Sequence, residues 1–236
     1  MSSPQCDITA VCDVWSGGLR QNTAMRFLPA LGTAVALLGL FAVSEVAGRR
    51  GVAPDNTRRL VHIVGAGTAA LFPLYLGLTD VVVLAVVFTL FLGWTRLRHS
   101  LKSVHAVARP TIGAVLFPIG LLVAAVVLWP HPEAFSYAAL MLAGPDAAAG
   151  IVGTRFASAT WRVAGGEKSV LGSLTFFVVA FALGLAFALA TGSDAIAGAA
   201  AVAVALTAVE GVLGYGLDNL CIPAVAGLLG EQWLRL

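Results

Sequence analysis

The sequence predicts an all-α protein, a polytopic membrane helix bundle of seven or eight transmembrane helices joined by short loops. Of its 236 residues, 59% are hydrophobic and 11% are charged, whereas a soluble domain carries about 25% charged residues. The mean hydropathy is +0.92. The apolar residues gather in runs that approach the ~20 residues an α-helix needs to cross a bilayer. The composition therefore excludes an ordinary soluble protein and leaves no room for a separate soluble domain.

Two regions of unequal size are expected along the chain. Residues 1–24 are polar and lack the apolar core of a signal peptide, so we expect a disordered tail, with Met25 as an alternative first residue. Residues 25–236 are expected to form a single transmembrane domain. The cysteines Cys6, Cys12 and Cys221 lack metal-ligand spacing, and we expect them to be free thiols.

Eight apolar runs are candidates for the spans, and the third and eighth are short. They cover Phe27–Val46, Leu60–Leu78, Val81–Trp94, Ile112–Trp129, Ala134–Val152, Leu171–Ala190, Ala195–Leu213 and Leu220–Leu234.

The loops between these runs differ in charge. Alternate loops hold eleven of the fourteen cations, namely Arg49, Arg50, Arg58, Arg59, Arg96, Arg98, Lys102, Arg109, Arg155, Arg162 and Lys168. The opposite loops, Gly77–Asp80, Pro130–Glu133 and Thr191–Asp194, hold no Lys or Arg. The positive-inside rule places the cationic loops in the cytoplasm, and eight spans then place both termini outside. Topology alone explains most of the cations between the third and fourth runs, where we find no motif.

Asp146 is the strongest single indication of a functional site. A carboxylate within a span costs about 2.5–3.5 kcal/mol on insertion scales, so it usually has a function or a charged partner. A structural pair with an arginine of a neighbouring helix is the alternative. The glycines that follow, Gly150 and Gly153, allow either close helix packing or close approach of the backbone to a phosphate.

The segment GGEKSVLGS, residues 165–173, combines a flexible turn with a cation and a hydroxyl group. Lys168 is a point charge suited to a phosphate, and Ser169 lies beside it. Ser169 is also a good helix cap at the start of the next run. The segment is not a P-loop, because the G-x-x-x-x-G-K-[ST] pattern is absent.

Three further polar residues are expected near the cytoplasmic membrane face, as Asp146 is. Glu210 and Asp218 would lie about 12 Å apart in a continuous helix, but Gly211, Gly214 and Gly216 predict a break that lets both acids approach one cation. Asn219 adds a neutral oxygen, and carboxylates with phosphate oxygens are the ligands that magnesium prefers. An exposed turn is the alternative for Asp218.

His62 lies three and four residues after two arginines in the segment RRLVHI, residues 58–63. On a helix, Arg58, Arg59 and His62 share one face. A histidine that bonds a backbone carbonyl is as good an explanation of His62 as a functional role.

Four segments together resemble the polyprenol kinase family, which includes phytol kinase and dolichol kinase. RRLVHI is similar to the RK-x-x-H start of a span, and PDAAAGIVGTRF to the D-x-x-A-x-x-x-G-x-x-[FG] block. GGEKSVLGS resembles K-[ST]-x-E-G-[ST], and Glu210 with DNLCIP resembles the late acid and the DN-L-x-[IVT]-P block. The matches run from Arg58 to Pro223. Leu171 replaces the usual acid before Gly172, and Pro145 stands where the family often has Gly or Ala.

The resemblance implies that residues 25–236 are a catalytic domain with Mg²⁺ as cofactor. This domain would transfer the γ-phosphoryl group of CTP, or of another nucleoside triphosphate, to a membrane-embedded isoprenoid alcohol such as phytol, geranylgeraniol or dolichol. Carried onto this sequence, the catalytic residues are Asp146, Lys168 and His62, and the metal ligands are Asp146, Glu210, Asp218 and Asn219. The nucleotide-binding residues are Arg59, Gly150, Gly153, Arg155, Lys168, Ser169 and Gly172. Phosphoryl transfer relies on positioning and charge neutralisation, which these residue types provide.

Two other classes of function compete with this hypothesis. A CTP-dependent cytidylyltransferase of the CDP-diacylglycerol or CDP-archaeol synthase type shares an Asp block and a KS block, but its HGG-x-x-DR motif is absent. A small transporter would place acids near the bilayer midplane, whereas these lie at one face. We expect a lipid alcohol, a nucleoside triphosphate and membrane lipids as partners, and no nucleic acid. The Gly- and Ala-rich later spans also suit a homo-oligomer. The expected location is the plasma membrane of a prokaryote, with the active site on the cytoplasmic face.

Overall fold

The computed structural model describes residues 27–106, 111–192 and 195–234. The predicted tail, Arg109, Cys6 and Cys12 lie outside the described residues. The elements are α3 (Leu28–Arg49), α4 (Pro54–Ala69), the 3₁₀-helix η1 (Phe72–Leu74), α5 (Leu78–Leu97), α6 (Lys102–His105), α7 (Gly113–Leu128), α8 (Pro132–Arg155), β1 (Thr160–Val163), β2 (Gly166–Ser169), α9 (Val170–Ala190), α10 (Ile196–Val212) and α11 (Asp218–Leu234).

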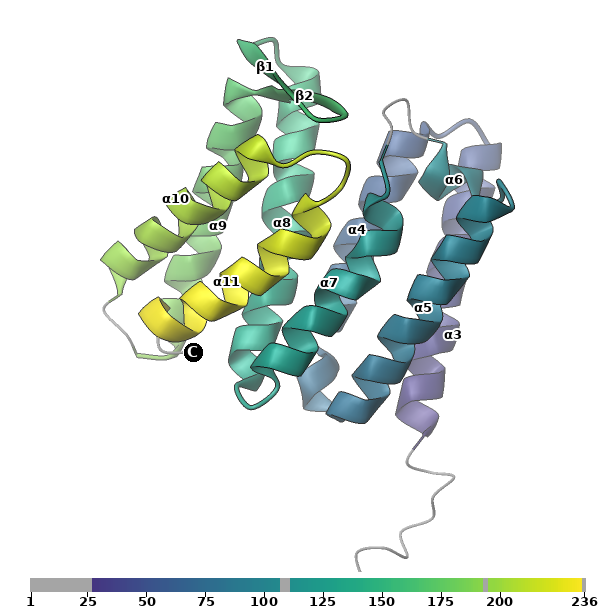
Figure 1. Cartoon of the computed structure of the whole chain (residues 1–236), viewed down its shortest axis with the longest axis horizontal. Helices are drawn as coiled ribbons and strands as arrows, with labels where there is room; N and C mark the ends of the chain where they lie inside the picture. Colours follow the sequence, from purple (N-terminus) through teal and green to yellow (C-terminus); the bar gives the residue numbers. More distant parts are fainter. Residues whose placement is uncertain (1–26, 107–110, 193–194, 235–236) are drawn as a thin grey trace, which may run out of the picture.

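The chain folds as a bundle of helices of the membrane-protein type, as predicted (Figure 1). Each of the eight apolar runs overlaps one long helix. Among the described residues, α3, α5, α8 and α9 are long and apolar enough to cross a membrane, whereas α7 and α10 are apolar but shorter. The number of spans, seven or eight, therefore stays a prediction.

The second helix differs from the predicted second span. Helix α4 begins at Pro54 rather than near Leu60 and ends at Ala69 rather than near Leu78. Pro54 suits the first helical turn, because its fixed φ matches a helix and its missing N–H would have no helical partner there. Pro73 has no N–H to bond the Ala69 carbonyl oxygen, which disfavours an α-helix there, and a 3₁₀ turn follows instead. The earlier start places Asp55, Arg58 and Arg59 within the helix.

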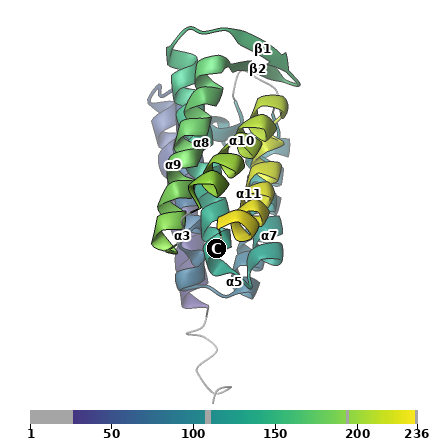
Figure 2. The ribbon, with the colours of Figure 1, turned by 90° about the vertical axis from the view of Figure 1, so that its left-hand side faces the viewer.

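A short hairpin departs from the predicted all-helical structure. Strands β1 and β2 pair antiparallel, with Trp161 opposite Lys168 and Arg162 opposite Glu167. Gly165 makes the turn at φ 78°, a conformation that glycine adopts without steric cost. Ser169 ends β2 and caps α9, because its side chain accepts a hydrogen bond from the Gly172 N–H at 3.2 Å. Figure 2 shows the hairpin lying across one end of the bundle.

The bundle has two parts that meet along α7 and α11. Helices α3 to α7 lie together on one side, and α8 to α11 lie on the other (Figure 1). Helix α11 packs against both α7 and α8, and α4 packs against α8. The crossing of α7 and α11 is close: a Cβ on Gly120 would lie 2.1 Å from the Asn219 carbonyl oxygen. Only glycine fits at position 120.

The cation-bearing segments among the described residues lie at one end of the bundle. The end of α3, the start of α4, α6, the end of α8 and the hairpin are together at the top of Figure 1. The turn between α7 and α8 lies at the opposite end, where His131 pairs with Glu231 at 3.2 Å. The fold therefore gathers these predicted cationic loops on one side.

Candidate active site

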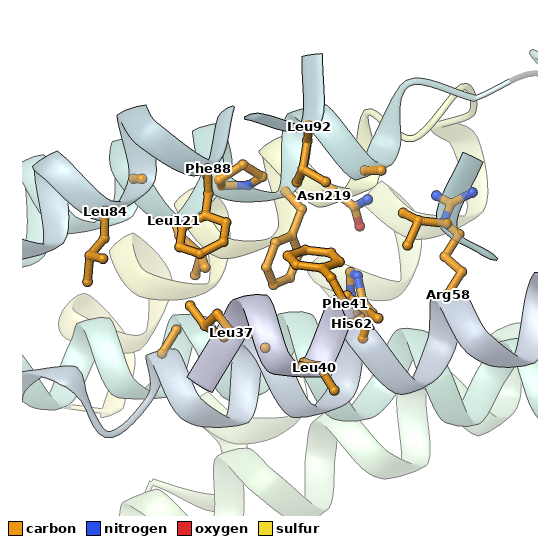
Figure 3. Close-up of a pocket in the computed structure, with 18 of the residues that line it drawn as sticks. Leu37, Leu40, Phe41, Arg58, His62, Leu84, Phe88, Leu92, Leu121 and Asn219 are labelled. Atoms are coloured by element: carbon orange, nitrogen blue, oxygen red, sulfur yellow. The ribbon is translucent and has the colours of Figure 1, made fainter. Parts of the chain in front are cut away.

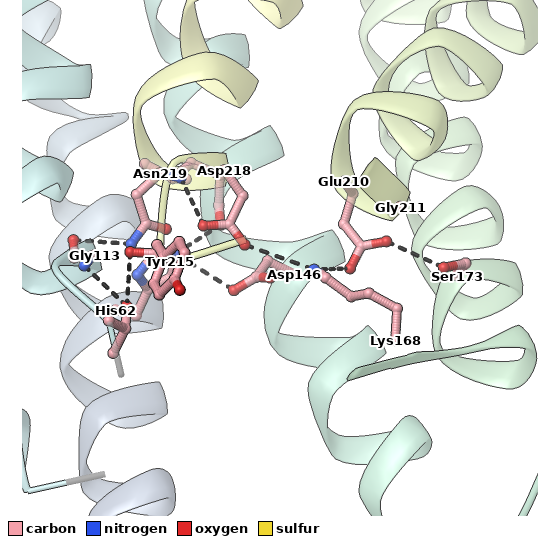
Figure 4. Close-up of polar contacts among 12 residues, drawn as sticks. His62, Gly113, Asp146, Lys168, Ser173, Glu210, Gly211, Tyr215, Asp218 and Asn219 are labelled. Atoms are coloured by element: carbon pink, nitrogen blue, oxygen red, sulfur yellow. Dashed lines mark hydrogen bonds and ion pairs between the residues drawn. The ribbon is translucent and has the colours of Figure 1, made fainter. Parts of the chain in front are cut away.

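A polar cavity of about 360 Å³ lies at the charged end of the bundle. Its walls come from α4, α8, the hairpin, α9, α10 and the start of α11. Its volume falls within the range of about 300–1,000 Å³ that is common for ligand pockets. Figure 4 shows the polar side chains that meet there, with Asp146 between His62 and Lys168 in the view. Segments far apart in the sequence thus contribute to one site.

Helix α4 supplies one wall through residues spaced three and four apart. Asp55, Arg58, Arg59 and His62 all line the cavity, as expected for residues on one helical face. The Arg59 Nη2 donates a hydrogen bond to the Gly150 carbonyl oxygen at 2.8 Å. This bond anchors the guanidinium group against α8, beside the cavity.

His62 connects α4 to the acidic residue of α8. Its Nε2 lies 3.0 Å from the Leu142 carbonyl oxygen and 4.0 Å from Asp146 Oδ2. A carbonyl oxygen only accepts hydrogen bonds, so Nε2 carries the proton in this arrangement. In the neutral ring, Nδ1 then has the lone pair. The Phe117 ring lies 4.8 Å from the imidazole, centroid to centroid, and supports its orientation.

Lys168 lies between two buried acids. Its Nζ contacts Glu210 Oε1 and lies 3.6 Å from Asp218 Oδ2. The three side chains are 10%, 5% and 10% exposed, respectively. Ser173 Oγ donates to the other oxygen of Glu210 at 3.1 Å. One cation thus faces two carboxylates in a region with little water.

The predicted break between Glu210 and Asp218 is confirmed. Helix α10 ends at Val212 and α11 begins at Asp218, with Tyr215 and Gly216 at φ 54° and 88°. The intervening loop contacts the hairpin, because the Tyr215 N–H donates to the Ala164 carbonyl oxygen at 3.1 Å. Asp218 is buried at the start of α11, which disagrees with an exposed turn.

Close packing of α8 and α9 forms the wall nearest the hairpin. A Cβ on Gly153 would lie 2.6 Å from Ser169 Oγ and 3.4 Å from the Gly172 Cα. The absence of side chains at both glycines brings the backbone and Ser169 to the edge of the cavity. Gly153 and Gly172 therefore act in packing and also line the cavity.

Most of the predicted site residues meet in this cavity. Arg155 does not line it, because it lies exposed at the end of α8. Leu171 does not line it either, and its backbone N–H donates to Ser158 Oγ at 3.3 Å. The predicted residues that do line it are Arg59, His62, Asp146, Gly150, Gly153, Lys168, Ser169, Gly172, Glu210, Asp218 and Asn219.

The four predicted metal ligands do not form a closed cage. Within residues 27–106, 111–192 and 195–234, no three His, Cys, Asp or Glu side chains converge as a metal-binding group. Lys168 stands between Glu210 and Asp218, and Asn219 Nδ2 donates to the Gly113 carbonyl oxygen at 2.9 Å. Magnesium is usually held by one or two carboxylates together with substrate phosphates. The donor chemistry of Asp146 and Asp218 fits that mode of binding.

Six charged or hydroxyl residues in the cavity were not predicted as site residues. They are Asp55, Arg58, Thr154, Thr160, Glu167 and Ser173. Helical spacing would have identified Ser173, four residues after Ser169, and Asp55, four residues before Arg59. Glu167 required the hairpin, which the sequence did not predict. Through Glu167 the hairpin brings a carboxylate to the cavity. Glu167 is four residues before Leu171, the position at which the family usually has an acid.

The fold and the site together define a class: a helix bundle of the membrane-protein type with a charged cavity at one end. A phytol kinase from Synechocystis sp. is 30% identical over 224 residues, which cover 90% of this chain and 95% of the relative. The chain belongs to the polyprenol and phytol kinase family, as its motifs predicted. No protein-family model and no solved structure matches the chain.

Proposed function

We propose that this protein is an integral membrane kinase that transfers the γ-phosphoryl group of CTP to the hydroxyl group of an isoprenoid alcohol such as phytol or geranylgeraniol. The observation that carries the proposal is the meeting of Lys168, Arg59, His62 and the buried acids in one cavity. These residues come from all four segments that resemble the family. Membership of the family supports kinase chemistry, and the resemblance supports CTP as the donor.

The nucleotide phosphates bind between α4, the α8–α9 contact and the hairpin. Arg59 and Lys168 supply positive charge, and Ser169 with the backbone at Gly153 and Gly172 supplies a close surface. Lys168 is engaged by Glu210 and Asp218. The acids hold the ammonium group in place, where it neutralises the negative charge that develops on the transferred group.

Magnesium is the proposed cofactor, and Asp146 and Asp218 are its proposed protein ligands. A bound magnesium ion would neutralise phosphate oxygens and help to align them. Glu210 is committed to Lys168 and Ser173, so its proposed role is to position the lysine. This differs from the predicted four-ligand set, in which Glu210 and Asn219 also bind the metal.

His62 is the proposed acceptor of the alcohol proton. The alcohol oxygen attacks the γ-phosphorus, the bond to the β-phosphate oxygen breaks, and CDP leaves. The hydroxyl proton passes to the imidazole, whose Nδ1 has the lone pair when Nε2 bonds Leu142. Asp146 at 4.0 Å stabilises the resulting imidazolium.

Transfer of label from CTP tests the reaction. Purified protein is incubated with Mg²⁺, an alcohol, and CTP labelled at either the γ or the α phosphate. We expect label in the lipid from the γ position alone. Label from the α position would instead show a cytidylyltransferase. Absence of transfer to phytol, geranylgeraniol, dolichol or diacylglycerol, with nucleoside triphosphates other than CTP also supplied, would contradict the kinase proposal and favour a transporter.

A further inference from the structure

A second, apolar cavity lies within the half of the bundle formed by α3, α4, α5 and α7. It is small, with a volume of about 80 Å³. Leu37 and Phe41 of α3, Leu84 and Phe88 of α5, and Leu121 of α7 contribute to its walls. Figure 3 shows these side chains around a common space, with Arg58 toward one end and Leu84 toward the other. The phosphoryl-transfer chemistry proposed above uses none of these apolar residues.

The two cavities adjoin at three polar residues. Arg58, His62 and Asn219 line both the polar cavity and the apolar one. This shared wall suits a ligand with a polar head and a long apolar tail, with the head at His62 and the tail between α5 and α7. The small volume also favours one kind of tail, because it admits one slender hydrocarbon chain more readily than the two acyl chains of a phospholipid.

We propose that the apolar cavity binds the tail of the alcohol and sets its chain length. This inference rests on the proposed function and adds the tail site to it. Along α5, the lining residues run from Leu92 near the polar end to Val81, a span of about 16 Å at the helical rise. This is about half of the ~30 Å hydrocarbon core of a bilayer. The site therefore matches a short prenol rather than a chain as long as dolichol.

Chain-length selectivity tests the tail site. Ala85 is buried and lines the cavity, midway along α5, so Ala85→Phe shortens the space. The neighbouring Val86 is 41% exposed on the outer face of the same helix, and Val86→Phe is the matched control. Initial rates are measured with geraniol, farnesol and geranylgeraniol, alcohols of increasing chain length.

We expect Ala85→Phe to lower kcat/KM for geranylgeraniol about tenfold or more relative to geraniol, the scale on which a hydrophobic pocket rejects a misfit. Retained turnover of geraniol shows that the variant is folded and catalytically competent. Val86→Phe keeps the selectivity of the unmodified protein. An unchanged geranylgeraniol-to-geraniol ratio in Ala85→Phe would overturn the proposal.

Photo-crosslinking provides a readout that does not depend on catalysis. A farnesol analogue with a diazirine near the tail end is irradiated with the full-length protein in phosphatidylcholine vesicles, and labelled peptides are mapped. We expect label on inward-facing residues of α5 and α7, displaced by excess geranylgeraniol and reduced by Ala85→Phe. This result would support the tail site even if no phosphoryl transfer were found. Label confined to lipid-facing residues would reject the tail site even if the kinase reaction were observed.

Discussion

Lys168 has a structural role beside its proposed functional one. Its ammonium group is almost fully buried between Glu210 and Asp218. Removing one partner of such a group leaves an uncompensated buried charge, which costs about 3–5 kcal/mol. The same placement holds the cation beside Ser169 and the glycine-lined wall. Loss of activity in a Lys168 variant therefore needs to be separated from loss of stability.

The first prediction concerns Lys168→Met. We expect activity to fall by about a hundredfold or more because the phosphate loses its cation, and the unfolding temperature to fall as well. Lys168→Met combined with Glu210→Gln restores the net charge of the cluster, so stability should largely recover while activity stays low. Lys102 is exposed on α6, and Lys102→Met is the control. Recovery of activity in the double variant would contradict the role of Lys168.

The second prediction concerns Asp146, which pairs loosely with His62 at 4.0 Å. Asp146→Asn keeps the size of the side chain and removes the charge. We expect phosphoryl transfer to fall about a hundredfold or more, with weaker dependence on the Mg²⁺ concentration and unchanged membrane insertion. Glu133→Gln, at the exposed opposite end of the same helix, should behave as the unmodified protein. Full activity of Asp146→Asn would contradict the proposed role of Asp146 in phosphoryl transfer.

At the scale of the elements, the crossing of α7 and α11 positions Asn219. Gly113 accepts a hydrogen bond from the Asn219 side chain, and Gly120 contacts the Asn219 backbone. Both glycines lie on α7, so this helix fixes the first turn of α11 and with it the buried carboxylate of Asp218.

The third prediction follows from this crossing. A Cβ at position 120 meets a backbone carbonyl, which cannot turn away as a flexible side chain can. Gly120→Ala should therefore destabilise the protein by about 1–3 kcal/mol and lower activity through Asp218. Gly93→Ala on α5 is the matched control, because no atom lies within 4 Å of its added Cβ. Thermal unfolding in detergent measures the stability of both variants. Equal stability of Gly120→Ala and Gly93→Ala would contradict the close crossing of α7 and α11.

The fourth prediction concerns how stability depends on pH, through His105 of helix α6. His105 Nε2 lies 3.0 Å from Thr95 Oγ1. Burial, followed by the guanidinium groups of Arg96 and Arg58, lowers the pKa of His105 from 6.5 to about 4. Between these values the unfolded chain binds more protons at this site than the folded chain. The contribution of His105 to stability therefore declines as pH falls below about 6.5 toward 4.

Thermal unfolding between pH 7 and pH 5 measures this effect. We expect the unfolding temperature to decrease with pH, and to decrease less steeply in His105→Gln, which removes the titrating group. His99 is exposed, so His99→Gln should retain the steeper dependence. Identical pH profiles for His105→Gln and the unmodified protein would show that His105 does not contribute.

At the scale of the whole molecule, the bundle has a charged end and an end with few charges. The polar cavity lies at the charged end, and the apolar cavity shares Arg58, His62 and Asn219 with it. The positive-inside rule would place the charged end in the cytoplasm, where CTP is made. A lipid alcohol would then meet the nucleotide at the membrane surface.

The fifth prediction concerns this orientation. In a cysteine-free background, Arg162→Cys on the exposed part of the hairpin should react with a membrane-impermeant maleimide only after the cells are permeabilised. Glu133→Cys, at the opposite end of the bundle, should react in intact cells. The reverse pattern would invert the proposed topology.

The sequence by itself determined the helix bundle, the grouping of charges and most of the residues that line the polar cavity. In lipid, a helix satisfies every backbone polar group of a long apolar run within the run itself. The motifs around His62, Asp146, Lys168 and Glu210 pointed to one chemistry. It did not reveal the hairpin, because two strands of four residues leave no clear pattern, and it therefore missed Glu167. Only the tertiary structure decided that Lys168 lies between Glu210 and Asp218. It also decided that Arg155 lies outside the polar cavity and that His62 lines an apolar cavity as well. These features depend on distances between helices, and close contacts such as Gly120 with Asn219 set those distances.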